Sequence, residues 1–391
     1  MKVLILHQYF NTPATGGPLR SYYLSKALID QGFEVVVITS HNESSYKTAS
    51  IEGIQVHYLP ITYDNRFGFY KRTYAFMRYA MRAIGIARKI NDVAFCYAIS
   101  VPITVGLPAL WLNQFYGIRF IFEVGDLWPD APIELGFVKN KVLRAFLYRM
   151  ERTIYKNAHA IVALSTAIKK HIETKIQGKE IHVIPNMADT IFYHPEPKLD
   201  QVVVKFKAKN KFVVSYIGAV GFANGLDYYL ECARASQKAG LPILFLLCGD
   251  GAFVDNLKTA ASRLVLENLV FIPFQHRGGV REIMNVSDAV FISYRPFPIL
   301  ETGSPNKYFD GLAAGKLILI NFGGWIREDI EHHQCGVYLD PRYPHEFVQK
   351  IQPFLEDNTF LQQHQLNARN LAELKYSRIT LSRQFVGLFR N

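Results

Sequence analysis

One segment in the second half of the chain combines groups that suit a diphosphate with a group that suits a ribose. Because Gly303 and Pro305 disfavour helical backbone before Asn306, we expect a helix to begin at Asn306. The free N–H groups of that helix start and the Lys307 ammonium attract phosphate. Asp310, one turn further along, can accept two hydrogen bonds from a ribose diol. The plainer alternative is a loop that caps a helix with a solvated Lys–Asp pair.

A glycine-rich turn near the start of the chain offers a second phosphate-binding candidate. Gly16 and Gly17 follow the first apolar strand, and a helical pattern opens at Arg20. Glycine lets a ligand approach the backbone closely, and Arg20 adds a positive charge beside the same helix start. The spacing matches neither the GxGxxG fingerprint nor a P-loop, so a purely structural turn is the alternative.

Acidic residues and a tryptophan gather after the strand expected at 119–124. Glu123 lies in that strand, and Asp126, Trp128 and Asp130 follow it. Carboxylates at a strand's carboxyl end can hydrogen-bond sugar hydroxyls or stabilise a developing positive charge. Trp128 could stack on a sugar face. We take Asp126, Glu123 and Lys307 as the catalytic candidates, against the alternative of a plain loop with a buried tryptophan.

These groups must be positioned by two α/β domains. A strand at 2–7, a glycine loop, a helix at 20–31 and a strand at 33–39 form one βαβ unit, which implies a parallel sheet. The pattern restarts with a strand at 212–217, a loop containing Gly218, and a turn at Gly249. We therefore predict two doubly wound α/β domains, with ligands outside the carboxyl ends of the strands and a cleft where the domains face each other. The predicted domains are residues 1–190 and 191–376, and the helix at 377–391 is expected to pack back on the first.

Composition narrows the classes of partner. The 391 residues carry a formal net charge of +11, which favours polyanions such as nucleic acid, anionic lipid or phosphorylated substrates. The four cysteines lie far apart without a CxxC pair, so we expect no metal site. No apolar stretch approaches the roughly 20 residues that span a bilayer. We therefore expect a protein that is cytoplasmic, or cytoplasmic and membrane-attached; in the second case it would be peripheral on the cytoplasmic face of the inner membrane.

The positive charge concentrates in the first domain. In the helix expected at 69–89, basic residues share one face and apolar residues the other, with Met77 and Met81 flanking. The basic residues are Lys71, Arg78, Arg82 and Lys89, and the apolar residues are Phe69, Phe76, Ala80, Ile84 and Ala87. A second basic stretch, at 139–156, includes Arg144 and Arg149. Both stretches suit docking on anionic lipid and a polyprenyl-diphosphate-linked acceptor, or are amphipathic helices with basic solvent faces.

Ordered motifs along most of the chain resemble the retaining glycosyltransferases of family 4, which have the GT-B fold of two Rossmann-like domains. The branch is similar to enzymes of O-antigen and capsule synthesis, including N-acetyl-L-fucosamine transferases. The motifs are Gly16-Gly17-Pro18-Leu19-Arg20, Asp126-Leu127-Trp128-Pro129, Ile184-Pro185-Asn186, Gly249-Asp250-Gly251 and the run from Ser304 to Gly315.

The resemblance implies a nucleoside diphosphate sugar held mainly by the second domain, retention at the anomeric carbon, and no metal or other cofactor. Gly17 then meets the donor phosphate, Asp126 faces the transferred sugar, and Asp310 takes the place of the ribose-binding glutamate. The donor set implied is Gly16, Gly17, Arg20, Gly218, Gly249, Arg277, Glu301, Thr302, Gly303, Ser304, Pro305, Asn306 and Asp310.

Two departures from the family pattern affect the donor site. The first family glutamate falls at Thr302, with Glu301 one residue early. The loop at 222–224 lacks the basic residue that often binds phosphate, so Lys307, Arg277 or Arg295 would have to compensate.

The resemblance implies transfer of an N-acetylated hexosamine or 6-deoxyhexosamine from a UDP-sugar to a polyprenyl-diphosphate-linked glycan, in surface polysaccharide synthesis. The alternatives are a GT-B enzyme of other chemistry, such as a nucleotide-sugar 2-epimerase or a phosphorylase, and a basic nucleic-acid-binding protein. No recognised nucleic-acid motif supports the last.

Overall fold

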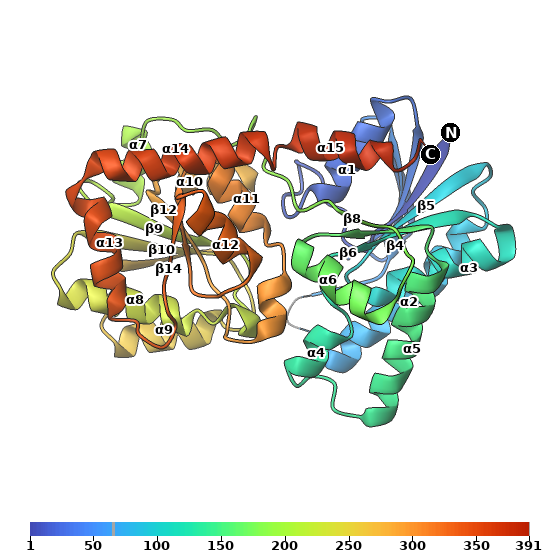
Figure 1. Cartoon of the computed structure of the whole chain (residues 1–391), viewed down its shortest axis with the longest axis horizontal. Coiled ribbons are helices and arrows are strands. Elements are labelled where there is room, and N and C mark those ends of the chain that lie inside the picture. The colour runs from blue at the N-terminus through green and yellow to red at the C-terminus, as the bar shows by residue number, and fades with distance from the viewer. Residues whose placement is uncertain (65–66, 391) are drawn as a thin grey trace. The chain divides into compact units, whose positions relative to one another are not determined.

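The computed structural model describes residues 1–64 and 67–390, and the chain divides into two compact units. Unit 1 consists of Met1–Pro185, Thr302–Ser304 and Ile379–Asn391. Unit 2 consists of Asn186–Glu301 and Pro305–Arg378. Each unit has its own sheet with helices packed around it (Figure 1).

Unit 1 is built on an eight-stranded sheet with the order β3-β4-β2-β1-β5-β6-β7-β8. All neighbouring strands are parallel except β3, which pairs antiparallel with β4 at the sheet edge. The strands are β1 (Lys2–Leu6), β2 (Glu34–His41), β3 (Lys47–Ile51), β4 (Ile54–Pro60), β5 (Val93–Ile99), β6 (Arg119–Val124), β7 (Ala160–Ala163) and β8 (Ile181–Val183).

Helices alternate with most of these strands, as parallel connections require. They are α1 (Arg20–Ile29), α2 (Phe69–Ala87), η1 (Ile103–Val105), α3 (Gly106–Tyr116), α4 (Asp130–Glu134), α5 (Lys141–Asn157) and α6 (Thr166–Lys175). The last helix of the chain, α15 (Arg378–Gly387), lies mostly in unit 1. There Phe385 packs on Tyr97 of β5, with ring centroids 4.8 Å apart.

Unit 2 is built on a six-stranded, fully parallel sheet with the order β11-β10-β9-β12-β13-β14. The four central strands are buried and mostly apolar, as expected for a sheet covered on both faces. The strands are β9 (Phe212–Ile217), β10 (Ile243–Cys248), β11 (Leu269–Ile272), β12 (Ala289–Ile292), β13 (Leu317–Ile320) and β14 (Gly336–Tyr338).

The helices of unit 2 follow the same alternation. They are α7 (Asp200–Lys205), η2 (Phe222–Asn224), α8 (Asp227–Lys238), α9 (Val254–Arg263), α10 (Arg277–Val286), η3 (Pro298–Thr302), α11 (Asn306–Ala313), α12 (Trp325–His332), α13 (Glu346–Glu356) and α14 (Asn358–Leu374).

The prediction of two doubly wound, largely parallel sheets is confirmed by this topology. The expected helix starts at 20 and 306 agree with α1 and α11, and the strand expected at 212–217 is β9. Three strands escaped prediction because they are short and only partly buried. These are β3, which forms a hairpin with β4 through a turn at Glu52 and Gly53, β8 and β14.

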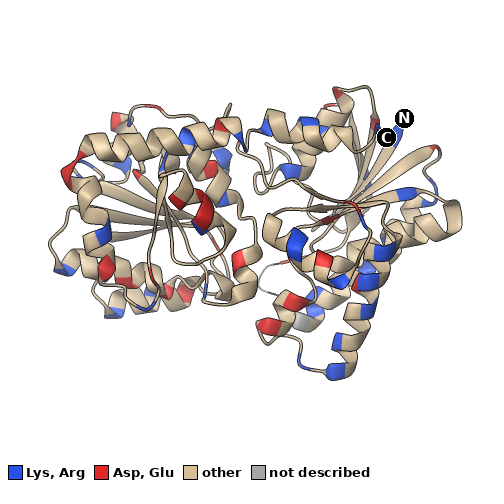
Figure 2. Cartoon of the chain, in the orientation of Figure 1, with Lys and Arg blue, Asp and Glu red and all other residues tan. Residues whose placement is uncertain are grey.

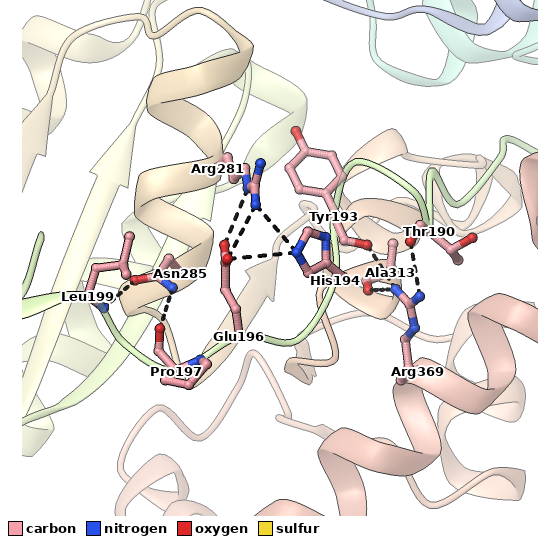
Figure 3. A network of polar contacts seen from close by, with 10 residues as sticks. All are labelled: Thr190, Tyr193, His194, Glu196, Pro197, Leu199, Arg281, Asn285, Ala313 and Arg369. Atoms are coloured by element: carbon pink, nitrogen blue, oxygen red, sulfur yellow. Dashed lines mark hydrogen bonds and ion pairs between the residues drawn. The ribbon is translucent and has the colours of Figure 1, made fainter.

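The stretch before β9 is tied to unit 2 by side chains of α10 and α14 (Figure 3). Arg281 of α10 pairs with Glu196, with 3.2 Å between nitrogen and oxygen. Arg369 of α14 donates a hydrogen bond of 3.0 Å to the carbonyl of Thr190. These contacts explain why the chain joins unit 2 well before its first strand.

Glycines bring the loops after β9 and β10 into backbone contact. A Cβ on Gly249 would lie 1.8 Å from the carbonyl oxygen of Gly218, and a Cβ on Gly251 would lie 2.3 Å from that of Val220. The Gly249 N–H donates to the carbonyl of Ile272 at the end of β11. Gly249, predicted to bind the donor, therefore has a packing role in shaping this edge of the sheet.

Candidate functional site

The winding of unit 2 reverses between β9 and β12, which are neighbours in the sheet. Open α/β sheets bind ligands outside the carboxyl ends of their strands at such a point. The loop that begins at Gly218 follows β9, and the segment leading to α11 follows β12. The topology thus brings two segments that are about 90 positions apart in sequence to one edge.

Lys307 connects these two segments. Its ammonium donates a hydrogen bond of 2.7 Å to the hydroxyl of Tyr216 and lies 4.0 Å from the centroid of that ring. A Cβ on Gly218 would lie 3.2 Å from the Lys307 Nζ, so glycine leaves the room that the lysine occupies. Burial lowers the pKa of the Lys307 ammonium to about 7. The positive charge is therefore poorly compensated, which is the property expected of an anion site.

The start of α11 adds backbone donors beside this lysine. Pro305 occupies the N-cap position, and no side chain caps the helix. The N–H groups at the first positions of an α-helix have no partner within the helix. The amides of Asn306 and Lys307 are therefore available for an anion.

Asp310 lies one turn further along α11, half-buried beside a charged pair. Its carboxylate has no hydrogen-bond partner within the part of the chain that the structure describes, and burial raises the pKa of this carboxyl to about 7. Arg277, at the start of α10, lowers that pKa, and Asp189 raises it. The Arg277 guanidinium pairs with Asp189 and lies 3.6 Å from the ring centroid of Phe192. Arg277 is thus near Asp310 but already bound to another carboxylate.

The residues before α11 are held in different ways. Glu301 accepts a hydrogen bond of 3.1 Å from the N–H of Gly323, in the loop after β13. Thr302 ends η3, and Gly303 and Ser304 form the connection to the N-cap of α11. The Glu301 carboxylate is therefore anchored to the neighbouring loop at this edge of the sheet.

Arg295 braces the glycine loop. Its Nε donates to the carbonyl of Phe222, and its guanidinium pairs with Asp227 at 2.9 Å. Among the basic residues proposed to compensate for the missing loop charge, Lys307 is the one that lacks an acidic partner among the described residues.

In unit 1, the glycine turn after β1 is shaped by backbone conformation. Gly16 and Gly17 have φ of 73° and 86°, values that favour glycine. The Gly16 N–H donates to the carbonyl of Thr12, and a Cβ on Gly17 would meet the Asn11 side chain at 3.1 Å. The turn leads into α1, whose first turn also lacks a side-chain cap.

Arg20 and Glu123 bind each other. The Arg20 Nε lies 3.0 Å from both Glu123 oxygens, and Tyr97 donates its hydroxyl to the same carboxylate. The rest of the guanidinium binds the carbonyls of Ile184 and Pro185, at 2.9 and 2.5 Å. The side chains of Arg20 and Glu123 are 8% and 1% exposed, which leaves them little access to a ligand. The structure therefore gives this predicted donor-binding and catalytic pair an internal role that fixes the end of unit 1.

Asp126 differs from its acidic neighbours. Its side chain is exposed, and within residues 1–64 and 67–390 it has no hydrogen-bond partner. Burial raises the pKa of the Asp130 carboxyl, but contacts with His171 and Lys175 outweigh burial and lower this pKa overall. Trp128 is half-buried and packs edge-on against Phe76 of α2, with centroids 6.4 Å apart. Asp126 is thus an exposed acidic group, two residues after β6, that is available to meet a substrate.

The outer side of α2 carries both charge and apolar groups, and we call it the basic face. Lys71 and Arg82 are exposed and Arg78 is half-exposed, whereas the exposed Lys89 lies two residues beyond the end of α2, which is shorter than the helix predicted at 69–89. Large apolar side chains share this face: Tyr70, Tyr74, Met77 and Met81 are 87%, 67%, 40% and 62% exposed. The buried side of α2 carries Phe76, Ala80 and Ala87 as predicted, whereas Ile84 is only half-buried.

The second basic stretch forms α5, where basic residues recur along the helix (Figure 2). Arg149 is exposed, as are the apolar side chains of Val142 and Phe146. Arg144 is half-buried because its Nε donates to the carbonyl of Val138 at 2.9 Å. Arg144 therefore ties the first turn of α5 to the preceding loop and keeps its charge.

Sequence reasoning missed several residues at the carboxyl edge of unit 2. Tyr216 is two positions before Gly218, and its place in a buried strand concealed its polar role. Asp189 follows the Ile184-Pro185-Asn186 motif and pairs with Arg277. Phe274, in the loop after β11, is 54% exposed.

The described residues contain neither a metal-binding cluster nor a membrane-spanning helix. No group of three or more His, Cys, Asp or Glu side chains there is arranged to hold a metal ion. In the same part of the chain, no helix is both long and apolar enough to cross a bilayer.

Comparisons with known protein families cover nearly the whole chain. Residues 15–192 match the model for Glycosyltransferase Family 4. Residues 198–371 match the model for Glycosyl transferases group 1.

Similar proteins share low sequence identity but extensive structural likeness. Alpha-D-kanosaminyltransferase of Streptomyces kanamyceticus is 21% identical over 249 residues, which are 61% of this chain and 62% of that protein's length. WcaI of Escherichia coli, named for glycosyl transfer in colanic acid biosynthesis, is 21% identical over 291 residues, 71% of this chain and 69% of WcaI. The structure of Anabaena HepE with UDP-glucose has a TM-score of 0.71 at 16% identity and covers 99% of each chain. The predicted fold class, GT-B, is confirmed.

The buried Arg20–Glu123 pair predicts a large cost for removing one charge. Glu123→Gln should lower the free energy of unfolding by roughly 3 kcal/mol, because it leaves the Arg20 guanidinium buried without its carboxylate. Glu43 and Lys47 form an ion pair on the surface, so Glu43→Gln is a matched control that should leave the free energy of unfolding nearly unchanged. Chemical denaturation of both variants measures the difference. Equal stabilities would contradict the internal role.

Proposed function

Because the chain belongs to the family 4 glycosyltransferases, we propose that it transfers a sugar from a UDP-sugar to a polyprenyl-diphosphate-linked glycan. The observation that carries the proposal is the poorly compensated Lys307 ammonium between the Gly218 loop and the start of α11. That arrangement suits a diphosphate at the ligand-binding edge of unit 2.

The proposed chemistry uses the diphosphate both as leaving group and as base. As the bond between the anomeric carbon and the diphosphate oxygen breaks, negative charge grows on the diphosphate. Lys307 and the first amides of α11 stabilise this charge, and donors that are already in position contribute most to such catalysis. The acceptor hydroxyl bonds to the anomeric carbon on the face that the leaving group vacates, and its proton passes to a phosphate oxygen. Configuration is thereby retained.

Recognition of the nucleoside is proposed for Asp310. An ionised carboxylate accepts two hydrogen bonds from adjacent hydroxyls, and Asp310 is half-buried without a hydrogen-bond partner among the described residues. Arg277 lies close enough to lower the pKa of this carboxyl, which favours its ionised form. Asp126 is proposed to face the transferred sugar from unit 1.

The UDP-linked donor and the pathway are proposed from likeness. HepE has been solved with UDP-glucose, and WcaI is named for colanic acid biosynthesis. Together with the resemblance to the O-antigen and capsule branch, these support a role in surface polysaccharide synthesis. The resemblance favours an N-acetylated hexosamine or its 6-deoxy form, such as N-acetylfucosamine, as the transferred sugar.

The acceptor is proposed to be reached at a membrane surface. The basic face of α2 pairs lysines and arginines with exposed tyrosines and methionines, a combination that suits the interface of an anionic bilayer. A lipid-linked acceptor would be presented at that surface. We therefore propose peripheral attachment to the cytoplasmic face of the inner membrane.

A transfer assay tests the proposed function and its two carboxylates. The protein, a panel of UDP-sugars and polyprenyl-diphosphate N-acetylglucosamine should yield a longer glycolipid and free UDP by mass spectrometry. Asp126→Ala should reduce transfer about 100-fold with little change in UDP affinity. Asp310→Asn should weaken UDP binding about tenfold, because it removes a charged hydrogen-bond acceptor.

Asp200→Asn is the control, because Asp200 is an exposed aspartate in α7 of the same unit. It should behave like the wild type in both measurements. An isomerised donor or a sugar phosphate in place of a new glycolipid would contradict the proposal. Unchanged transfer and binding in the Asp126 and Asp310 variants would remove the assignment of those residues.

The basic face predicts binding to anionic vesicles. Replacing Lys71 and Arg82 with Gln should weaken association with phosphatidylglycerol-containing vesicles about 30-fold, at about 1 kcal/mol for each charge. Lys258 and Arg263 are exposed on α9 of unit 2 and provide a control pair with the same charge change. Flotation assays compare the two. Equal losses in both pairs would show that overall charge, rather than α2, drives attachment.

A further inference from the structure

The hydroxyl of Tyr216 connects the glycine loop to the lysine of α11. Tyr216 is fully buried in β9, and its hydroxyl donates a hydrogen bond of 2.6 Å to the carbonyl of Ala219. Because a phenol has one hydrogen to donate, its oxygen must act as the acceptor toward Lys307, at 2.7 Å. The chain of contacts therefore runs from the Lys307 ammonium through Tyr216 to the backbone of the loop.

The surroundings of Lys307 leave most of its hydrogen-bonding capacity unused. An ammonium has three N–H donors, and Tyr216 is its one hydrogen-bond partner in the part of the chain that the structure describes. The ammonium is flanked by the Tyr216 ring on one side and by Gly218 on another. The remaining donors suit an acidic ligand.

The titratable groups around this lysine are few. From β9 comes Tyr216, and from the segment after β12 comes Tyr294, which acts on the pKa of Tyr216. Asp310 lies on the same helix, and its electrostatic partners are Arg277 and Asp189. The side chains that α12 and α14 bring to α11 bind elsewhere: Asp329 holds the Tyr308 hydroxyl, and Arg369 holds the Ala313 carbonyl.

We propose that Tyr216 is a positioning residue for the donor: its hydroxyl holds the Lys307 amine against the glycine loop, and the arriving diphosphate supplies the countercharge that fixes a proton there. The inference rests on the proposed function for the identity of the ligand. It adds that donor binding and proton uptake are one event and that Tyr216 controls both.

The direction of the pH dependence follows from the pKa of Lys307. In the free protein burial lowers this pKa to about 7, and a diphosphate beside the ammonium raises it. Binding therefore adds about half a proton to Lys307 at pH 7 and close to one at pH 8. Affinity should fall roughly tenfold for each pH unit well above 7. Affinity should also fall below pH 7, because the Asp310 carboxyl has a pKa of about 7 and is proposed to bind the ribose in its ionised form.

Calorimetry with UDP-N-acetylglucosamine tests this coupling, because its diphosphate is a diester that does not titrate between pH 6 and 8.5. Titrations in buffers of different ionisation enthalpy give the number of protons taken up. Tyr216→Phe removes an acceptor of the ammonium and lowers the pKa of Lys307 further. The loss of affinity should therefore be roughly tenfold at pH 8 and much smaller at pH 6.

Tyr229→Phe is the matched control. Tyr229 is also fully buried in unit 2, and its hydroxyl lies within hydrogen-bond distance of the carbonyl oxygens of Val214 and Leu246, at 2.9 and 3.0 Å. Its removal should leave both the affinity and the proton uptake unchanged. An equal loss at pH 6 and pH 8 for Tyr216→Phe, or an equal effect of Tyr229→Phe, would reduce Tyr216 to a structural role and overturn the proposal.

A second measurement needs no ligand. In protein labelled with ¹³C at the lysine ε-carbons, the resonance that disappears in Lys307→Arg should titrate near pH 7 and move to lower pH in Tyr216→Phe. A titration near pH 10 in both proteins would overturn the proposal. If UDP-N-acetylglucosamine fails to bind while this resonance titrates as expected, the donor identity is wrong and the role of Tyr216 stands.

Discussion

A half-buried ammonium without an internal carboxylate is the feature on which the rest of the site depends. Removing a charge from water is costly unless a partner compensates it, and the hydrogen bond of Lys307 within the described residues goes to the neutral Tyr216. Lys307 is held in this environment because the strand order places α11 beside the loop after β9. A protein that keeps such a charge poorly compensated gains a site where an anion binds favourably.

In unit 1 a buried positive charge, that of Arg20, does have an acidic partner. Arg20 lies in a similar place, at the first helix after a glycine turn, yet its guanidinium is compensated by Glu123 and by two backbone carbonyls. The two units share a strand order but differ in where the countercharge comes from. In unit 1 the Glu123 carboxylate compensates the charge of Arg20 and stabilises the structure. In unit 2 Lys307 has no such carboxylate, and this indicates a ligand site.

Local signals in the sequence predicted the parts of this account that depend on neighbouring residues. Gly303 and Pro305 indicated the start of α11, and spacing placed Lys307 and Asp310 one turn apart. Contacts between distant segments could not be read in the same way. Arg20 and Glu123 are 103 positions apart, and their pairing depends on strand order. The packing of Gly249 on Gly218, likewise, follows from β9 and β10 being neighbours.

The most direct test of the central claim is a crystal structure of the protein with UDP bound. We predict diphosphate oxygens within about 3 Å of the Lys307 Nζ and of the first N–H groups of α11, a normal hydrogen-bond distance. The Tyr216 hydroxyl should remain bound to Lys307 in that complex. A nucleotide bound elsewhere, with Lys307 in contact only with Tyr216, would contradict the account.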